Sequence, residues 1–172
     1  MKLIIFKKSF ILAVAAIIAV GATIGICCGL ATKPANAASE KVIVIDAGHG
    51  GIDAGVRGIT TDTKESDINL SVAKKLKSCF TDAGFSVVLT RNNNGGLYGL
   101  STSGFKMRDM KKRKEIIQTA KADMVISIHQ NFCPIPTKRG STVFFDKSSE
   151  SGKLLAGFIQ TELNTLNDGV KP

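Results

Sequence analysis

The chain contains two histidines, and each directly follows a short apolar run that is typical of a β-strand. His49 comes after "VIVID" in "VIVIDAGHGG", and His129 ends "MVISIH". Glu65, in "TKESDINL", precedes Ser66, a residue type that favours the N-cap of a helix. Two imidazoles and one carboxylate from three separate segments form a ligand set suited to zinc. A fourth position left for water is typical of catalytic rather than structural zinc sites.

Each of these residues also has a simpler interpretation. A histidine in a glycine-rich loop is often only polar, and a glutamate before a helix is favoured by the helix dipole. Their joint placement is what predicts a site, because parallel strands end at one edge of a sheet and the helix after the first strand begins there. We further predict that Asp46 and Asn131 orient the imidazoles. The glycines Gly48, Gly50 and Gly51 would let the backbone turn sharply around the metal.

Strand-like and helix-like segments alternate along the rest of the chain. We predict strands over residues 41–47, 85–90, 123–129 and 140–146, and helices over residues 66–80, 108–121 and 148–166. Strands separated by helices indicate an α/β fold with a mostly parallel, twisted sheet and helices on both of its faces. In such sheets ligands bind at the C-terminal ends of the strands, where both histidines are expected.

The spacing of apolar residues predicts which side of each helix is buried. For the first helix the expected apolar stripe is Ile68, Val72, Leu76 and Cys79, and Gly84 is expected to stop the helix. The stripe of the second helix contains Met110, Ile117 and Ala120. Arg113 falls on that same stripe, and a buried arginine needs a partner. The stripe of the third helix is Leu155, Phe158, Ile159, Leu163 and Leu166.

The first 37 residues are predicted to be an export segment. A basic start precedes an uncharged run over residues 10–32, and Ala35-Asn36-Ala37 offers a cleavage site. The run exceeds the usual core of about 7 to 15 residues and reaches the roughly 20 residues of a spanning helix. Both a signal peptide cleaved after Ala37 and a retained membrane anchor therefore stay open. Residues 38–172 are expected to form one exported domain. A lipid anchor at Cys27 is disfavoured by the bulky Ile26.

Charge and cysteine content exclude several other classes. Of 23 lysines and arginines four lie in the leader, which leaves 19 basic against 14 acidic residues, a net charge of +5. The basic run over residues 106–114 has no interleaved aromatic residue, so we expect no nucleic-acid partner. Cys79 and Cys133 lack the spacing of a zinc finger or a disulfide framework, and Cys79 is expected in the core. The "CPIP" context of Cys133 does not favour a reactive thiol.

The segments "VIVIDAGHGGIDAG", "KESDINLSVAKKL", "GFSVVLTR", "RKEIIQTAKADMVISIHQN" and "GSTVFF" follow one another from about Lys41 to the end of the chain. Together they resemble the motifs of the zinc-dependent N-acetylmuramoyl-L-alanine amidases of the Amidase_3 type. "GLYG" before "KMRDMKKR" is most similar to the spore-cortex, germination-associated (CwlD-like) branch. The resemblance implies Zn²⁺ bound by His49, Glu65 and His129. It also implies hydrolysis of the amide between N-acetylmuramic acid and the L-alanine of the stem peptide, in the cell wall or spore cortex.

The family carries a further catalytic glutamate in a C-terminal strand, and this sequence ends at "LNDGVKP" without that motif. Neither Glu150 nor Glu162 has the matching context, so no catalytic glutamate is assigned. We therefore expect an amidase domain that is incomplete at its C-terminus, lacks a strand of its sheet, and leaves an edge or an apolar face uncovered. The alternative is an inactive form that binds zinc and cell wall without cutting. The need for an accessory protein stays open.

Overall fold

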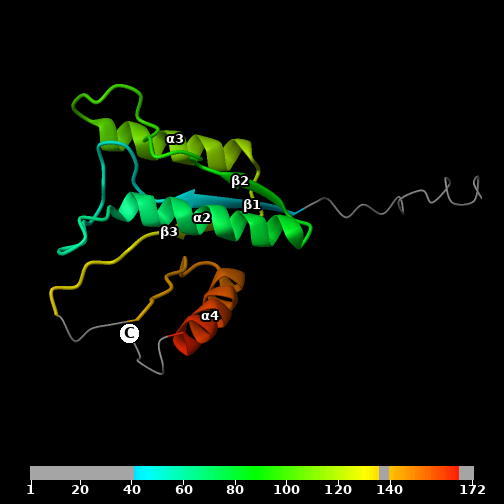
Figure 1. Ribbon diagram of the computed structural model, residues 1–172. Helices are drawn as coiled ribbons and strands as arrows, with labels where there is room; N and C mark the ends of the chain where they lie inside the picture. Colours follow the sequence, from blue (N-terminus) through cyan, green and yellow to red (C-terminus); the bar gives the residue numbers. More distant parts are fainter. Residues whose placement is uncertain (1–40, 136–139, 167–172) are drawn as a thin grey trace, which may run out of the picture.

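Three parallel strands form the sheet at the centre of the fold. The computed structural model describes residues 41–135 and 140–166. The strands are β1 (Val42–Ala47), β2 (Ser86–Leu89) and β3 (Met124–Ile128), in the order β2-β1-β3. The helices that follow them in turn are α2 (Glu65–Asp82), α3 (Phe105–Thr119) and α4 (Glu150–Thr165). Strands that follow one another along the chain are linked through a helix, and the predicted α/β class with a parallel sheet is confirmed (Figure 1).

The hydrophobic core lies between the central strand β1 and helix α2. Ile43, Ile45 and Ala47 of β1 are at most 1% exposed and cluster with Leu70 and Ala73 of α2. Because side chains alternate along a strand, these three residues share one face of the sheet. Full burial of an isoleucine or leucine side chain contributes roughly 1.5–3 kcal/mol to stability. This small core fixes the position of α2 beneath β1, and with it the start of α2 at the sheet edge.

Helix α2 is rotated relative to its predicted orientation. Its inward residues include Glu65, Ser66 and Asn69, whereas Val72 is 41% exposed and Cys79 is exposed. The prediction that Cys79 belongs to the core is therefore wrong. Ser66 is also not the N-cap, because the helix already begins at Glu65 and Ser66 is buried in its first turn. Polar side chains face inward here because they contact the loops at the sheet edge. The helix ends near Gly84, as predicted.

Helix α3 approaches the sheet from the other side, so helices lie on both faces, and Figure 1 shows the strands passing between α2 and α3. Arg113 of α3 is 3% exposed, and its guanidinium lies 2.6 Å from Asp46 Oδ1 and 2.5 Å from Asp109 Oδ2. The predicted partner for this inward arginine therefore exists. Met110, by contrast, was expected on the buried stripe and is 63% exposed. An ion-pair network rather than an apolar stripe attaches this helix.

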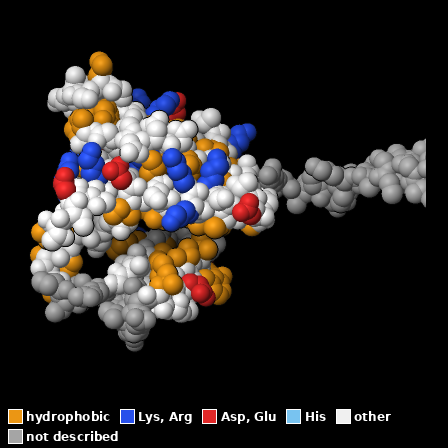
Figure 2. Space-filling model, in the orientation of Figure 1, with side chains coloured by type: hydrophobic (Ala, Val, Ile, Leu, Met, Phe, Trp, Pro, Cys, Tyr) orange, Lys and Arg blue, Asp and Glu red, His pale blue; other side chains and the backbone are white. Residues whose placement is uncertain are grey.

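The segment before α4 is not a strand. Residues 140–146 were predicted as a fourth strand, but the structure assigns them no strand hydrogen-bond pattern. The backbone N–H of Val143 instead donates to the side chain of Gln160 in α4. Ser149 caps α4 by accepting a hydrogen bond from Gly152 N at 3.0 Å. On the predicted apolar side of α4, Phe158 and Leu166 are 65% and 77% exposed, whereas Leu155, Ile159 and Leu163 are half-buried. Figure 2 shows hydrophobic side chains on this part of the surface.

Several predictions fall on residues that the structure does not describe. The export segment over residues 1–37, its cleavage or retention as an anchor, and the domain boundary after Ala37 all lie outside the described residues. So does the end of the chain from residue 167 onward. Within residues 41–135 and 140–166, no helix combines the length and the apolar character needed to cross a bilayer.

Candidate metal centre

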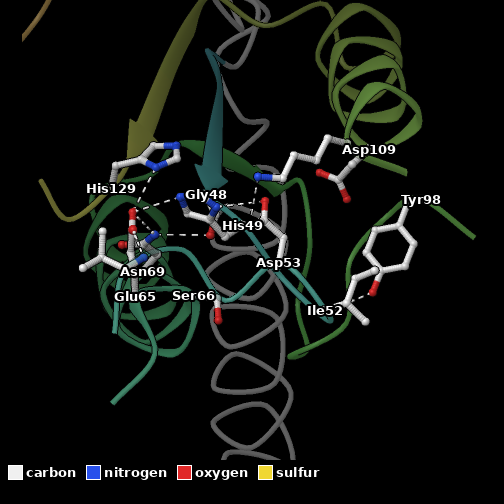
Figure 3. Close-up of polar contacts among 12 residues, drawn as sticks. Gly48, His49, Ile52, Asp53, Glu65, Ser66, Asn69, Tyr98, Asp109 and His129 are labelled. Carbon is white, nitrogen blue, oxygen red and sulfur yellow. Dashed lines mark hydrogen bonds and ion pairs between the residues drawn. The ribbon is translucent and has the colours of Figure 1, made fainter. Parts of the chain in front are cut away.

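The structure brings His49, Glu65 and His129 together at the carboxyl edge of the sheet. His49 follows β1, Glu65 is the first residue of α2, and His129 follows β3. One potential ligand atom from each lies within 4.8 Å of the other two, and Figure 3 shows the two imidazoles on either side of the glutamate. The arrangement arises because parallel neighbouring strands end together and the helix after β1 begins where that strand ends.

Glu65 is the centre of this group. Its Oε1 lies 3.2 Å from His49 Nε2 and 3.1 Å from His129 Nδ1, and its side chain is 3% exposed. The backbone N–H of Val56 donates to Oε2 and that of Gln130 donates to Oε1, each at 2.9 Å. Burial alone would raise the pKa of Glu65, but these N–H donors and the nearby imidazole lower it below its usual value. The carboxylate is thus held in its ionised form, which a metal requires.

His49 is oriented by Asp53, four residues further along the chain. Asp53 Oδ2 lies 3.0 Å from His49 Nδ1, which leaves Nε2 of the same ring directed at Glu65 (Figure 3). His49 itself has a positive φ of 61°, a backbone conformation that few residues other than glycine adopt. Burial raises the pKa of Asp53, but the hydrogen bond and charge of His49 and the charge of Lys106 together lower it. A carboxylate behind a ligating imidazole is the usual orienting partner in metal sites.

The two residues predicted to orient the imidazoles lie beside the group, but neither has a described hydrogen bond to a ring. Asp46 accepts hydrogen bonds from Thr90, Ser127 and Arg113. Burial raises its pKa, while the charge of Arg113 and these hydrogen bonds lower it. Asn131 lines the pocket beside the group, without a hydrogen bond to an imidazole among the described contacts. In the structure Asp46 pairs with the buried Arg113, and the carboxylate beside His49 Nδ1 is that of Asp53. An orienting role of Asp46 or Asn131 stays a prediction.

Two buried arginines hold the backbone of the histidine loop. Arg91, 4% exposed, donates to the carbonyl oxygens of Ala47 and Gly48 at 2.8 and 2.9 Å. Arg113 donates to those of Ala47 and His49 at 2.8 and 2.7 Å. The two guanidinium groups together thus hold three successive carbonyl oxygens, those of residues 47–49 at the end of β1. The place of Arg113 on a helix stripe indicated that it is buried, whereas no pattern indicated this for Arg91, which follows a strand inside a polar run.

Glycines let the ligands approach one another. A Cβ on Gly48 would lie 2.3–2.7 Å from three ring atoms of His129, so the imidazole packs directly on bare backbone. A Cβ on Gly55 would lie 2.4 Å from Glu65 Oε2. Gly50 and Gly51 have φ values of 141° and 63°, which agrees with the sharp turn predicted there. Asn69 is fully buried and donates to Gly48 O at 3.2 Å and Glu65 Oε1 at 3.3 Å, a contact that the sequence did not indicate.

Two of the three donor separations match those around a zinc ion. Zinc is bound tetrahedrally by imidazole nitrogens and carboxylate oxygens at about 2.0–2.2 Å, which places neighbouring ligand atoms about 3.3 Å apart. The separations of 3.2 and 3.1 Å between Glu65 Oε1 and the two ring nitrogens are close to that value. The group opens into a pocket of about 550 Å³. Glu150, Glu162 and Cys133 are not among the residues that line it.

Comparisons with known proteins agree on one family. The sequence profile described as N-acetylmuramoyl-L-alanine amidase (Amidase_3) matches residues 43–171. The germination-specific N-acetylmuramoyl-L-alanine amidase of Bacillus subtilis is 32% identical over 128 residues, which are 73% of this chain and 53% of that protein. The amidase AmiA of Escherichia coli is 28% identical over 79% of this chain and 43% of its own length. The chain thus spans about half the length of these curated relatives.

Solved structures give the same result. The CwlD amidase of Clostridioides difficile, determined in complex with the GerS lipoprotein, superposes with a TM-score of 0.70 at 36% identity. The match covers 77% of this chain and 69% of that chain. The catalytic domain of CwlV, an N-acetylmuramoyl-L-alanine amidase from Bacillus (Paenibacillus) polymyxa var. colistinus, has a TM-score of 0.57 at 28% identity, over 70% of this chain and 63% of that one.

Proposed function

This chain belongs to the N-acetylmuramoyl-L-alanine amidase family, and we propose that it hydrolyses the amide between N-acetylmuramic acid and the L-alanine of the peptidoglycan stem peptide with the help of zinc. The observation that carries the proposal is the convergence of His49, Glu65 and His129 from three separate segments. These three residues are proposed as the zinc ligands. Two imidazoles and one carboxylate leave a coordination position open, as catalytic zinc sites do.

The residues around the group support this role through charge and orientation. When bound there, zinc would polarise the scissile carbonyl and lower the pKa of a water to about 7. Glu65 is kept ionised by backbone N–H groups, so no proton competes for its oxygen. Asp53 fixes the ring of His49 so that Nε2 faces inward. The side chain of His129 is 51% exposed, which leaves this side of the group accessible to a substrate.

The biological setting is proposed from the relatives. One relative is named as germination-specific, and the structural neighbour from C. difficile was solved with a lipoprotein partner. We propose that this protein acts outside the cytoplasmic membrane, in the cell wall or spore cortex. Residues 1–37 are the proposed signal that directs its export. Peptidoglycan glycan strands and stem peptides are its proposed partners, and an accessory protein is a further candidate.

One observation favours a second candidate function. Among the described residues, the carboxylates that line the pocket are Asp53 and Glu65, and both are already engaged with imidazoles. A general acid or base typically contributes about 10²- to 10⁴-fold to an enzymatic rate. A form that binds zinc and cell wall without cutting is therefore the alternative. It differs from the amidase in yielding no new N-terminal alanine from wall sacculi.

Zinc titration tests the ligand assignment. We expect about one zinc per chain by competition with a chromophoric chelator. His49→Ala and His129→Ala together should abolish this binding, whereas Lys114→Gln, on the exposed side of α3, should leave it unchanged. Circular dichroism on each variant would confirm that the fold persists. Full zinc binding by the double histidine variant would refute the site.

Activity is measured separately on purified sacculi. The zinc-loaded protein should release stem peptides with a free N-terminal alanine, detected by amine labelling and chromatography. Chelation should stop the release, and added zinc should restore it. Zinc binding and sacculus binding without any new alanine terminus would favour the non-cutting alternative.

A further inference from the structure

Lys106 places a cation at the rim of the pocket that contains the His-Glu-His group. It is the second residue of α3, and it lines both the pocket of about 550 Å³ and an adjoining cavity of about 260 Å³. Its side chain is 71% exposed, and Nζ lies 3.7 Å from Asp53 Oδ1. Apart from the two imidazoles, it is the one basic side chain among the described residues that line the larger pocket.

The ammonium group of Lys106 has N–H donors available for a ligand. Its separation of 3.7 Å from Asp53 is too long for a hydrogen bond, and an ammonium carries three N–H donors. The other basic residues of α3 with described contacts are used elsewhere. Arg108 donates to the carbonyls of the preceding loop, Arg113 is buried, and Lys112 pairs with Glu115. Lys106 is therefore the residue of this helix that is positioned to contact a ligand in the pocket.

Charge makes the pocket suited to an anion. With a zinc ion bound, the metal and Lys106 together outweigh the single negative charges of Glu65 and Asp53 by one positive charge. Without the lysine the balance is zero. A concave site with low-dielectric walls focuses such a field, so an anionic group on the substrate is favoured beside Lys106.

The lining of the same pocket also includes two aromatic side chains. Phe132 and Phe144 line it, with exposed fractions of 59% and 82%. Both come from the chain between β3 and α4, and Figure 1 shows this segment and the start of α3 on opposite sides of the carboxyl end of β1. Aromatic rings offer apolar contact to the C–H faces of a sugar ring. The pocket thus combines a cation, two aromatic rings and the His-Glu-His group in one lining.

We propose that Lys106 binds the free carboxylate of the second residue of the stem peptide, while Phe132 and Phe144 contact the muramoyl sugar. This inference rests on the proposed amidase function. Two residues of extended chain span about 7 Å, so that carboxylate lies about that far from the scissile amide. Lys106 is separated from the ring of His49 by a single carboxylate, Asp53, which is compatible with this reach. Lys106 would then determine specificity for stem peptides that are not amidated at this position.

Two matched ligands test the inference by binding. They are N-acetylmuramoyl-L-alanyl-D-glutamate with its γ-carboxyl blocked as an amide, and the same compound with a carboxamide also in place of the remaining free α-carboxylate. Calorimetric titration of the zinc-loaded protein should show about threefold to tenfold tighter binding of the carboxylate form, as expected for a partly exposed ion pair. Lys106→Gln should abolish this preference and Lys106→Arg should retain it. Lys114→Gln removes the same charge from a position that lines neither cavity, and it should retain the preference too.

The outcomes separate this inference from the amidase function. Equal affinity of the native protein for both ligands, or a preference that survives Lys106→Gln, would overturn the role of Lys106 and leave the zinc site and the amidase proposal standing. Failure of the zinc-loaded protein to bind either ligand would overturn both. Phe132→Ala should weaken the two ligands by the same factor, and a loss confined to the carboxylate form would contradict the proposed orientation.

Discussion

The loop after β1, residues 48–56, and helix α4 differ in what holds them in place. The backbone of the β1 loop is fixed by two buried arginines, and its histidine is held by two carboxylates. Among the described residues, no buried side-chain nitrogen or oxygen lacks a hydrogen-bond partner. Helix α4 buries only Ala156, exposes much of its apolar side, and contacts the preceding segment through Gln160.

The two regions differ in how narrowly their contacts define the positions of the side chains. Buried polar groups are costly unless each is hydrogen-bonded, and a fully satisfied network permits essentially one arrangement of its members. Such a network surrounds the His-Glu-His group, whereas α4 depends on ordinary amphipathic spacing. We therefore expect substitutions of the buried members of this network to change both stability and metal binding, and substitutions on the exposed side of α4 to change neither.

The largest effect is expected from Arg113→Met. This change leaves Asp46 and Asp109 as partly unpaired, buried carboxylates, and loss of one partner of a buried ion pair typically costs about 3–5 kcal/mol. Urea denaturation of the metal-free protein should show this decrease in the free energy of unfolding. Zinc affinity should fall as well, because the carbonyl of His49 loses its donor.

Arg57→Gln is the matched control for that experiment. Arg57 pairs with Asp62 at 2.9 Å, but the two side chains are 49% and 80% exposed. Exposed pairs contribute about 0–1 kcal/mol. A similar loss of stability in both arginine variants would contradict the special role of the buried network.

A smaller and more selective effect is expected from Asp53→Asn. An amide cannot hold His49 Nδ1 as strongly as a carboxylate, and loss of such an orienting partner typically lowers metal affinity about 10- to 100-fold. The side chain of Asp53 is 24% exposed, so the free energy of unfolding should change little. Chelator competition and urea denaturation on the same samples would separate the two effects. Unchanged zinc affinity would show that Asp53 does not position the imidazole.

Acidification should weaken the network before it weakens the apolar core. The folded-state pKa of Asp46 is lower than its ordinary value of about 3.9, so the unfolded chain binds more protons between the two values. The stabilisation by Asp46 is present above about pH 5 and is lost as the pH falls through the lowered pKa. Urea midpoints of the metal-free protein should therefore decrease across this range. The urea midpoint of Asp46→Asn should be lower at pH 7 and should decrease less steeply as the pH falls. Parallel curves of midpoint against pH for the two proteins would exclude a contribution from Asp46.

Sequence patterns predicted the strands and the meeting of the three candidate ligands for a simple reason. Apolar strand patterns are local, and the rule that parallel strands end at one edge converts two sequence positions into one place. The same reasoning failed for α2, because it treats polar residues as solvent-facing. Glu65 and Asn69 face inward to bond Gln130 and Gly48, and they turn the helix away from its apparent apolar stripe. Networks of this kind depend on contacts between distant segments, which local spacing does not reveal.

The predicted strand over residues 140–146 failed for a different physical reason. A β-strand needs a partner for its backbone hydrogen bonds, and alternation of side chains alone cannot supply one. In the structure the N–H of Val143 is satisfied by the side chain of Gln160, and the carbonyl of Ser141 accepts from the same amide. Asp53 was missed for a similar reason, because nothing in "HGGID" distinguishes an aspartate that turns back onto His49 from one that faces solvent.

The smallest effect is expected from Phe158→Ser on α4. Sequence spacing placed Phe158 on a buried stripe, yet it is 65% exposed, so its replacement should change the free energy of unfolding by no more than about 0.5 kcal/mol. Leu70→Ala is the matched control, because Leu70 is 4% exposed in the β1–α2 core and its truncation should cost about 2–5 kcal/mol. Urea denaturation of both variants measures the contrast. A cost above about 2 kcal/mol for Phe158→Ser would mean that this side of α4 is covered in solution, and the difference between the two regions would then be smaller than the described contacts indicate.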